Sequence, residues 1–310
     1  MTFRICRWIF ITLALLRLSP LSFANMDNPP ICDKAPSGGL RIRFQEDVEL
    51  RRQKDNFGMV VAGNDTWLFF NPELETASLP PEEVLAITNQ IVHFHQALAQ
   101  IGIEVIYAPI PTKWAVYPEK ISDVVKTENI SEVTRMDANR QKLLELLRAQ
   151  GVTVVDLMPA FIEHKTTDPV FFKHDTHWSP AGAMIAARVI ADVIKRRPWY
   201  RNPSSPGHGP LLYTPAGNPG WKTLFWPGDL RNYLTYGENK AIADKIPVLR
   251  NFLTYGGNKA IADKIPVEEI RAKHIEGSDS ISRDSPVLIF GDSNVKGILP
   301  DNISFGRYLA

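Results

Sequence analysis

Apolar and polar positions alternate in blocks along the first third of the chain, and each block has the length of one secondary-structure element. Residues 59–63 and 67–70 are two apolar runs separated by an Asn-Asp pair, which predicts two strands joined as a hairpin. The next block opens with two prolines and two glutamates and then spaces its apolar residues by three and four positions. This spacing predicts a helix that ends at Gly102. Its expected apolar stripe is Val84, Ile87, Ile91, Phe94, Leu98 and Ile101.

The middle of the chain continues with strand, helix and strand. Residues 103–110 are a β-branched run, which predicts a buried strand that ends in the loop Pro111-Thr112-Lys113. A helix rich in leucine stops at Gly151, and residues 152–157 predict the next strand. This order of elements indicates a parallel sheet covered by helices.

A further helix is predicted to begin at Ser179 and Pro180, because serine is a good N-cap and proline is favoured at the first helical position. Its buried stripe is expected at Ala183, Ala187, Ile190 and Ile194.

The carboxyl-terminal third is organised differently. The stretch from residue 198 to about 228 is rich in Pro, Gly and Trp and is interpreted as an irregular excursion. Residues 231–248 then recur almost letter for letter at 250–267, a tandem repeat over 231–267. Two copies do not make a solenoid, so we interpret the repeat as a duplication that loops out at the surface.

The amino terminus is typical of an exported protein. Arg4 and Arg7 precede the apolar run of residues 8–16, and small residues at 22 and 24 suit a signal peptidase. The run is shorter than the roughly 20 residues that span a bilayer, so we expect a signal peptide at 1–24, with an uncleaved inner-membrane anchor as the alternative. Cys32 would then be the only cysteine of the mature chain, which allows no internal disulfide.

Composition and charge remove one class of function. The chain has 44% hydrophobic and 22% charged residues, which is ordinary for a globular protein. Its formal net charge is +1, and the sequence contains no block of Lys and Arg of the kind that grips phosphates. Nucleic acid is therefore not an expected partner.

The candidate chemistry is a serine triad. Residues 286–290 predict a buried strand that delivers Ser293 at its carboxyl end, where α/β sheets place their active sites. A serine hydroxyl needs a base within hydrogen-bond reach and a group that orients this base. Asp175 and His177 can supply them, because residues two apart in an extended segment project to the same side. We therefore predict Ser293 as nucleophile, His177 as base and Asp175 as its orienting group.

Four motifs then indicate a family. The pattern Asp-x-His-Trp followed by Ser-Pro-x-Gly, at residues 175–182, resembles the hallmark of the alginate O-acetyltransferase family and its SGNH-hydrolase-like relatives. Three other segments also resemble motifs of that family: Gly63-Asn64-Asp65-Thr66-Trp67-Leu68-Phe69, Ile110-Pro111-Thr112-Lys113 with Val116-Tyr117-Pro118, and Pro227-Gly228-Asp229-Leu230. The resemblance spans roughly residues 60–293.

This resemblance implies a fold, an activity and a location. The fold would be an SGNH-hydrolase-like α/β domain, a flavodoxin-like, mostly parallel sheet flanked by helices, over residues 59–310 after an N-terminal lead at 25–58. The activity would be transfer of acetyl groups onto an alginate-like exopolysaccharide in the periplasm through an acetyl-enzyme. A membrane-bound O-acyltransferase and other polymer-secretion proteins would be its partners. No cofactor is expected.

The sequence leaves alternatives open. His174, Asp175 and His177 could be metal ligands, although zinc sites use three or four ligands and no His-x-x-x-His pair lies nearby. A carbohydrate acetylesterase would use the same triad with water as the acceptor. An inactive relative that binds polysaccharide or a partner is the third alternative. Among single residues, His164 and His174 are expected at surface or loop positions, Trp67 and Trp178 as packing aromatics, and Lys113 as a solvated loop lysine.

The carboxyl end departs from the family pattern. Only seventeen residues follow Ser293, whereas relatives continue with further helices and strands. We therefore expect a shortened carboxyl-terminal part, with apolar surface exposed beside Ser293 and impaired activity.

Overall fold

The structure, a computed structural model, describes two long ranges, residues 38–127 and 135–201, and several short pieces. The short pieces are residues 213–215, 222–226, 228–230, 234, 263–267 and 270–272. The predicted signal peptide, Cys32, the strand at 286–290 and Ser293 lie outside the described residues. No helix within the described ranges has the length and apolar character needed to cross a membrane.

The predicted hairpin is confirmed and belongs to a three-stranded antiparallel sheet. Strands β1 (Asn56–Phe57), β2 (Val60–Ala62) and β3 (Leu68–Phe70) lie in that order, and Val61 pairs with Phe69. Helix α1 (Gly38–Lys54) precedes the sheet and packs Phe44 and Val48 into the same core as Val61. The sequence interpretation took this region as a lead segment and missed the helix.

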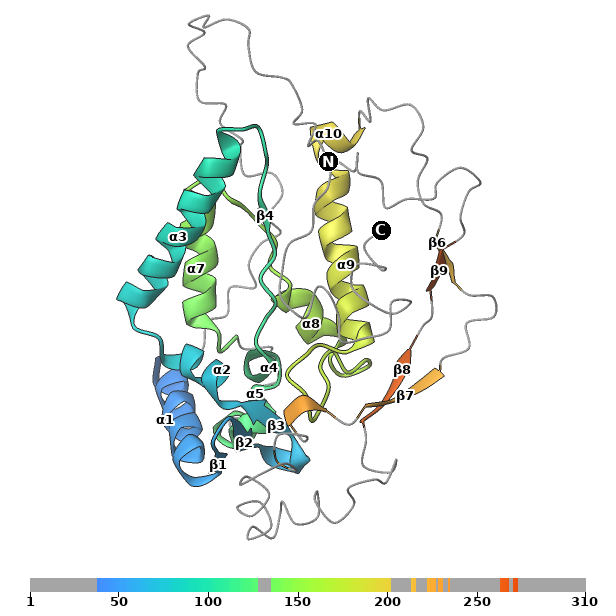
Figure 1. Cartoon of the computed structure of the whole chain (residues 1–310). Coiled ribbons are helices and arrows are strands. Elements are labelled where there is room, and N and C mark those ends of the chain that lie inside the picture. The colour runs from blue at the N-terminus through green and yellow to red at the C-terminus, as the bar shows by residue number, and fades with distance from the viewer. Residues whose placement is uncertain are drawn as a thin grey trace, which may run out of the picture.

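Helix α3 (Pro81–Ala99) is confirmed, but half of its predicted stripe is wrong. Val84, Thr88 and Val92 are buried, whereas Ile87, Phe94 and Ile101 are 37%, 53% and 69% exposed. The reason is that α3 packs on one side only, against α7 (Ala138–Ala149), beside which it lies in Figure 1. Residues four apart lie on one narrow face of a helix, and this face is enough to contact a single neighbouring helix.

The parallel pairing of the two middle strands is also confirmed. β4 (Ile106–Tyr107) pairs in parallel with β5 (Thr153–Val154), with α7 between them in the chain. Both strands are shorter than predicted, because the ladder covers two residues of each and Ile103 already lies exposed at the start of the expected strand.

Helix α9 (Pro180–Lys195) begins and packs as predicted. The Ser179 hydroxyl caps it by accepting a hydrogen bond of 3.1 Å from the Gly182 amide, and all four residues of the expected stripe are buried. A side chain at Gly182 would clash with the carbonyl oxygen of Val170, so the helix start and the preceding segment approach each other closely. This approach fixes the loop that leads into α9.

Short helices and turns complete the two long ranges. They are α2 (Asn71–Glu75), η1 (Asn64–Thr66), η2 (Thr76–Ser78), α4 (Lys113–Val116), α5 (Pro118–Ile121), α6 (Val124–Thr127), α8 (Met158–His164) and α10 (Pro198–Arg201).

The carboxyl-terminal pieces correct two interpretations. The stretch taken as irregular contains β6 (Tyr213–Pro215) and β7 (Lys222–Trp226), which pair antiparallel with β9 (Ile270–Ala272) and β8 (Asp263–Val267). Strand β8 is the end of the second repeat copy, so this part is paired in a sheet. In the first copy, Leu234 is 1% exposed and packs with Phe57 and Leu68, so the repeat is not simply a surface loop. Its other residues lie outside the described ranges.

Candidate active site

The predicted dyad lies in a loop between α8 and α9 that is closed on itself by backbone contacts. Phe171 and Trp178 form an antiparallel bridge, and the Ser179 amide donates to the Val170 carbonyl at 2.9 Å. Phe171 and Trp178 are both buried, which anchors the two ends of the loop in the core. The residues between them are therefore presented on a rigid base.

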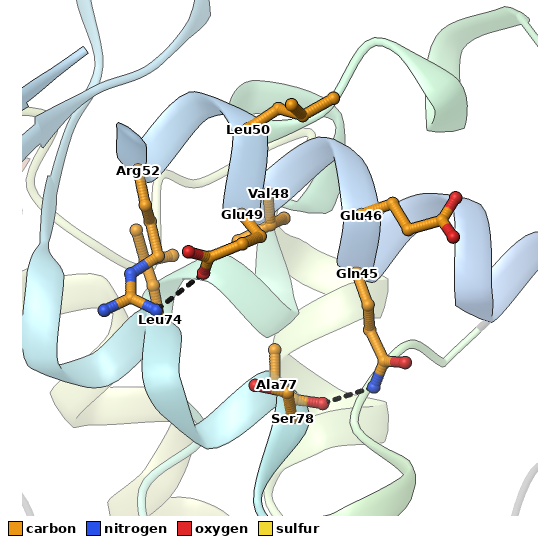
Figure 2. A pocket seen from close by; sticks show the side chains of 9 residues that line it. All are labelled: Gln45, Glu46, Val48, Glu49, Leu50, Arg52, Leu74, Ala77 and Ser78. Carbon is orange, nitrogen blue, oxygen red and sulfur yellow. Dashed lines mark hydrogen bonds and ion pairs between the residues drawn. The ribbon is translucent and has the colours of Figure 1, made fainter. Parts of the chain in front are cut away.

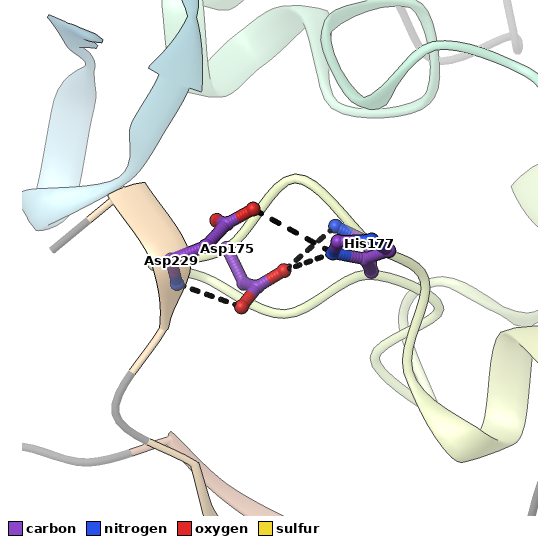
Figure 3. Close-up of side chains that lie close together, drawn as sticks. All are labelled: Asp175, His177 and Asp229. Atoms are coloured by element: carbon purple, nitrogen blue, oxygen red, sulfur yellow. Dashed lines mark hydrogen bonds and ion pairs between the residues drawn. The ribbon is translucent and has the colours of Figure 1, made fainter. Parts of the chain in front are cut away.

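Asp175 and His177 meet as predicted. Asp175 Oδ1 lies 2.7 Å from His177 Nδ1, and it also accepts the His177 backbone amide at 2.9 Å (Figure 3). Their side chains are 1% and 11% exposed. A carboxylate on Nδ1 favours the tautomer that carries its proton there, which leaves Nε2 as the basic nitrogen. The arrangement is that of an oriented general base.

Asp229 joins the dyad from 54 residues further along the chain. Its backbone amide donates to Asp175 Oδ2 at 2.8 Å, so both oxygens of Asp175 are engaged. The Asp229 carboxylate in turn accepts the Thr176 amide at 2.8 Å and the Thr176 hydroxyl at 2.6 Å, and it lies 3.6 Å from His177 Nδ1. The sequence interpretation noted Asp229 in a family motif but gave it no role.

The surroundings of Asp229 shift the pKa of its carboxyl. Burial raises the pKa of its carboxyl above the ordinary value, and the nearby Asp175 carboxylate raises it further, against the lowering effect of the Thr176 hydrogen bonds. The two carboxylates lie close to the same imidazole, that of His177.

Lys113 contradicts the expectation of a solvated loop lysine. Lys113 is only 1% exposed. Its ammonium donates hydrogen bonds to the backbone carbonyls of Leu68, Lys173 and Asp175, at 2.7, 2.8 and 3.0 Å. The ammonium also lies 5.1 Å from the centre of the Trp67 ring. Lys113 thus fastens the backbone of the dyad loop to strand β3, because three carbonyls satisfy the three donors of an ammonium.

Glu73, on α2, is a titratable group that sequence reasoning missed. Burial raises the pKa of its carboxyl to about 7, while the Lys113 charge opposes this rise and the Asp229 charge adds to it. His177 also acts on Glu73 electrostatically. No motif pointed to Glu73, since its proximity to the dyad arises only in the folded chain.

Some of the remaining expectations for single residues agree with the structure and others do not. Trp178 is a buried packing residue as expected, and Trp67 packs against Tyr117 with ring centres 4.5 Å apart and ring planes tilted by 39°. His164 lies at the end of α8, and His174 lies in the loop but is 3% exposed, so it is not a surface residue. Among the predicted catalytic groups the structure brings Asp175 and His177 together, and Ser293 lies outside the described residues.

The ligand set for a metal differs from the one considered in the sequence. Asp175, His177 and Asp229 each offer one ligand atom, and these atoms lie within 4.8 Å of one another. His174 is not part of this group. Three ligands of this kind can hold a metal only if the ion displaces the hydrogen bond between Asp175 and His177.

A separate hollow of about 670 Å³ lies between α1 and the segment of α2 and η2 (Figure 2). Three of its polar side chains are engaged with neighbours: Gln45 Nε2 donates to the Ala77 carbonyl at 2.6 Å, and Arg52 pairs with Glu49 at 2.8 Å. It contains no nucleophile with a base beside it, so it is not a competing active site.

Comparison with known proteins agrees with the motifs. Residues 60–207 match the family model described as an SGNH hydrolase-like domain of the acetyltransferase AlgX. The probable alginate O-acetylase AlgJ of Pseudomonas putida is 29% identical over 178 residues, which are 56% of this chain and 42% of that protein. Its counterpart in Azotobacter vinelandii is 24% identical over 68% of this chain and 54% of that protein.

Among solved structures, the chain is similar to the O-acetyltransferase domain of Pseudomonas putida AlgJ, with 22% identity and a TM-score of 0.46. That match covers 71% of this chain and 67% of the other. The chain spans about half the length of the two curated relatives. Through residues 60–207, just under half of its length, the chain is similar to the SGNH hydrolase-like domain of the acetyltransferase AlgX.

Proposed function

We propose that this protein transfers acetyl groups onto an alginate-like exopolysaccharide, with Asp175, His177 and Ser293 as its catalytic groups. The observation that carries the proposal is the buried contact of 2.7 Å between Asp175 and His177 Nδ1, inside a domain of an acetyltransferase family. A base oriented in this way needs a nucleophile, and Ser293, after an apolar run, is the candidate that the sequence offers.

The reaction would run as a double displacement. Ser293 Oγ attacks the carbonyl carbon of an acetyl donor while His177 Nε2 takes the hydroxyl proton, and the donor's leaving group then departs with that proton. A sugar hydroxyl next attacks the acetyl-serine, again with His177 as base, which forms the sugar acetate and returns Ser293. Asp175 stabilises the imidazolium that forms in each half.

The location and partners follow from the same proposal. A signal peptide at residues 1–24 would export the chain to the periplasm, where an exopolysaccharide is accessible. Two of the relatives are named probable alginate O-acetylase, which supports a polyuronate as acceptor. A membrane-bound O-acyltransferase would supply the acetyl group from the other side of the membrane.

The test is turnover of a small acetyl ester by the purified chain and its variants. His177→Ala, Asp175→Asn and Ser293→Ala should each lower turnover about 10³-fold or more, because members of a triad act as a unit. Asp192→Asn is the matched control, since this aspartate is on the exposed side of α9 with a side chain 63% exposed. Turnover within a few fold of wild type in His177→Ala would overturn the proposal.

Two further measurements separate the alternatives. Labelling of Ser293 by a fluorophosphonate favours an enzyme, and its absence in folded protein favours a binding role. Acetylated polymannuronate as product, rather than acetate alone, distinguishes transfer from hydrolysis. Loss of activity on chelation, restored by zinc, would instead assign Asp175, His177 and Asp229 to a metal.

A further inference from the structure

We infer that Asp229 is a positioning residue that locks the Asp175–His177 dyad by clamping the loop from two directions at once. This inference rests on the proposed function, because it assigns a role within the same site. In one direction the Asp229 amide donates to Asp175 Oδ2 at 2.8 Å. In the other, the Asp229 carboxylate accepts the Thr176 amide and hydroxyl at 2.8 and 2.6 Å. Residues 175 and 176 are therefore held by one amino acid.

The backbone at Gly228 permits this clamp. Gly228 has a φ of +82° in the left-handed region, and a side chain there would clash with the carbonyl oxygen of His174. Only glycine allows the segment to approach the dyad loop so closely and then turn the Asp229 amide toward Asp175. Leu230, the next residue, is 3% exposed and packs with Leu68 and Val60, which anchors the segment against the hairpin.

The clamp restricts what the dyad can do. With Oδ2 engaged by Asp229, Asp175 presents Oδ1 to His177, and the carboxylate cannot rotate without losing both bonds. Thr176 lies between the two acids and is fixed at its amide and its hydroxyl. Its hydroxyl oxygen lies 3.1 Å from His177 Nδ1, so the ring nitrogen is held between Asp175 and Thr176. The expected result is one ring tautomer with Nε2 aimed outward.

Asp229 is much more exposed to solvent than the carboxylate it holds. Its side chain is 43% exposed, whereas that of Asp175 is 1% exposed. Removing it should therefore disturb the geometry of the dyad far more than the stability of the fold.

The experiment compares Asp229→Ala, Thr176→Val and Thr176→Ser in the full chain. Asp229→Ala removes the carboxylate half of the clamp and keeps the backbone amide. We expect it to lower kcat about 10- to 100-fold with KM changed less than about twofold, because a small misplacement of a catalytic group costs rate rather than affinity. Thr176→Val should lose about 10-fold and Thr176→Ser should restore most of it, since serine keeps the hydroxyl. The double variant Asp229→Ala with Thr176→Val should lose less than the product of the two single losses, because both remove the same contact. Asp192→Asn is the control.

A second readout does not depend on turnover. Long-range ¹H–¹⁵N correlations of the His177 ring, assigned with His177→Ala, report its tautomer. We expect a single tautomer protonated at Nδ1 in the wild type, Thr176→Ser and Asp192→Asn, and a tautomer mixture in Asp229→Ala. If the wild type fails to turn over any acetyl ester, the proposed function fails while the ring spectra still decide the clamp. Wild-type spectra and rates in Asp229→Ala would overturn the inference.

Discussion

Two clusters of charged side chains in this molecule are built on opposite plans. In the first, Arg135 and Arg140 pair with Asp137 and Asp156, so each carboxylate has a guanidinium partner, and we call this cluster balanced. Arg135 pairs with Asp137 at 2.7 Å and with Asp156 at 2.5 Å, and Arg140 pairs with Asp156 at 2.5 Å. In the second, the carboxylates of Asp175 and Asp229 both lie within 3.6 Å of His177 Nδ1, so two carboxylates share one imidazole, and we call this cluster unbalanced.

The titration behaviour of the two clusters differs in the same way. Burial alone would raise the pKa of Asp156, but Arg140 and Arg135 outweigh it and hold the pKa below its ordinary value. In the second cluster, burial and the neighbouring Asp175 both raise the pKa of Asp229. A balanced cluster is stable as it stands, whereas an unbalanced one stabilises a positive charge that arises during a reaction. The difference favours a structural role for the first cluster and is consistent with the catalytic role proposed for the second.

Removing the central cation of the balanced cluster should cost the most stability. Arg135→Met leaves Asp137 and Asp156, whose side chains are 2% and 9% exposed, with Arg140 as the guanidinium that still pairs with both. Breaking a buried ion pair by removing one partner costs about 3–5 kcal/mol, so we expect a loss of that size in the free energy of unfolding by urea.

The controls for this variant probe both clusters. Arg188→Met, on the exposed side of α9, should change stability by less than about 0.5 kcal/mol. His177→Ala should lower stability far less than Arg135→Met while it removes activity. A stability loss in His177→Ala equal to that in Arg135→Met would show that the second cluster is also structural.

Lys113 anchors the loop that carries the unbalanced cluster, because its buried ammonium donates to the backbone carbonyl of Asp175. Lys113→Met withdraws the donor from three carbonyls, including that of Asp175, and unpaired buried acceptors cost about 1–3 kcal/mol. We expect a loss of about 2 kcal/mol in urea unfolding. Activity should fall more than that loss explains, since the loop that carries the dyad is released. Lys142→Met, with a side chain 62% exposed, is the control, and equal effects of the two variants would contradict the role of Lys113.

The buried position of Lys113 could not be predicted from the sequence. Its three acceptors are 45, 60 and 62 residues away in the chain, so nothing local distinguishes it from a solvated lysine. The same holds for Asp229, which reaches Asp175 across 54 residues. By contrast, the start of α9 was predicted correctly because Ser179, Pro180 and Gly182 encode it within four positions.

Helix faces show the same division between local and long-range information. The spacing of Leu40, Phe44 and Val48 was a local signal for α1 that the sequence interpretation overlooked among charged residues. The buried face of α3 could not be read in this way, because its apolar residues extend beyond the side that α7 covers. The dyad was predicted because both residues belong to one short motif.

The smallest expected effect concerns Glu73, the third carboxyl near the unbalanced cluster. Burial, opposed by Lys113 and reinforced by Asp229, raises its pKa from an ordinary 4.5 to about 7. Between these two values the folded chain keeps the proton and the unfolded chain loses it. By linkage, stability therefore falls as pH rises from about 4.5 to 7, and the loss is complete above 7. When Glu73 is protonated, it is neutral and places no additional negative charge near Asp229.

Glu73→Gln should remove this dependence, because the amide keeps the shape of the protonated acid. Glu73 is half-buried, so solvent weakens the effect, and we expect the variant to be more stable than the wild type by about 1–2 kcal/mol at pH 8 and equal to it at pH 4. Urea unfolding at four pH values between 4 and 8 measures the difference. Glu145→Gln, with a side chain 53% exposed, should leave the wild-type slope intact. If Glu73→Gln retains that slope, the excess carboxylate charge does not extend to Glu73, and the unbalanced cluster is confined to Asp175, His177 and Asp229.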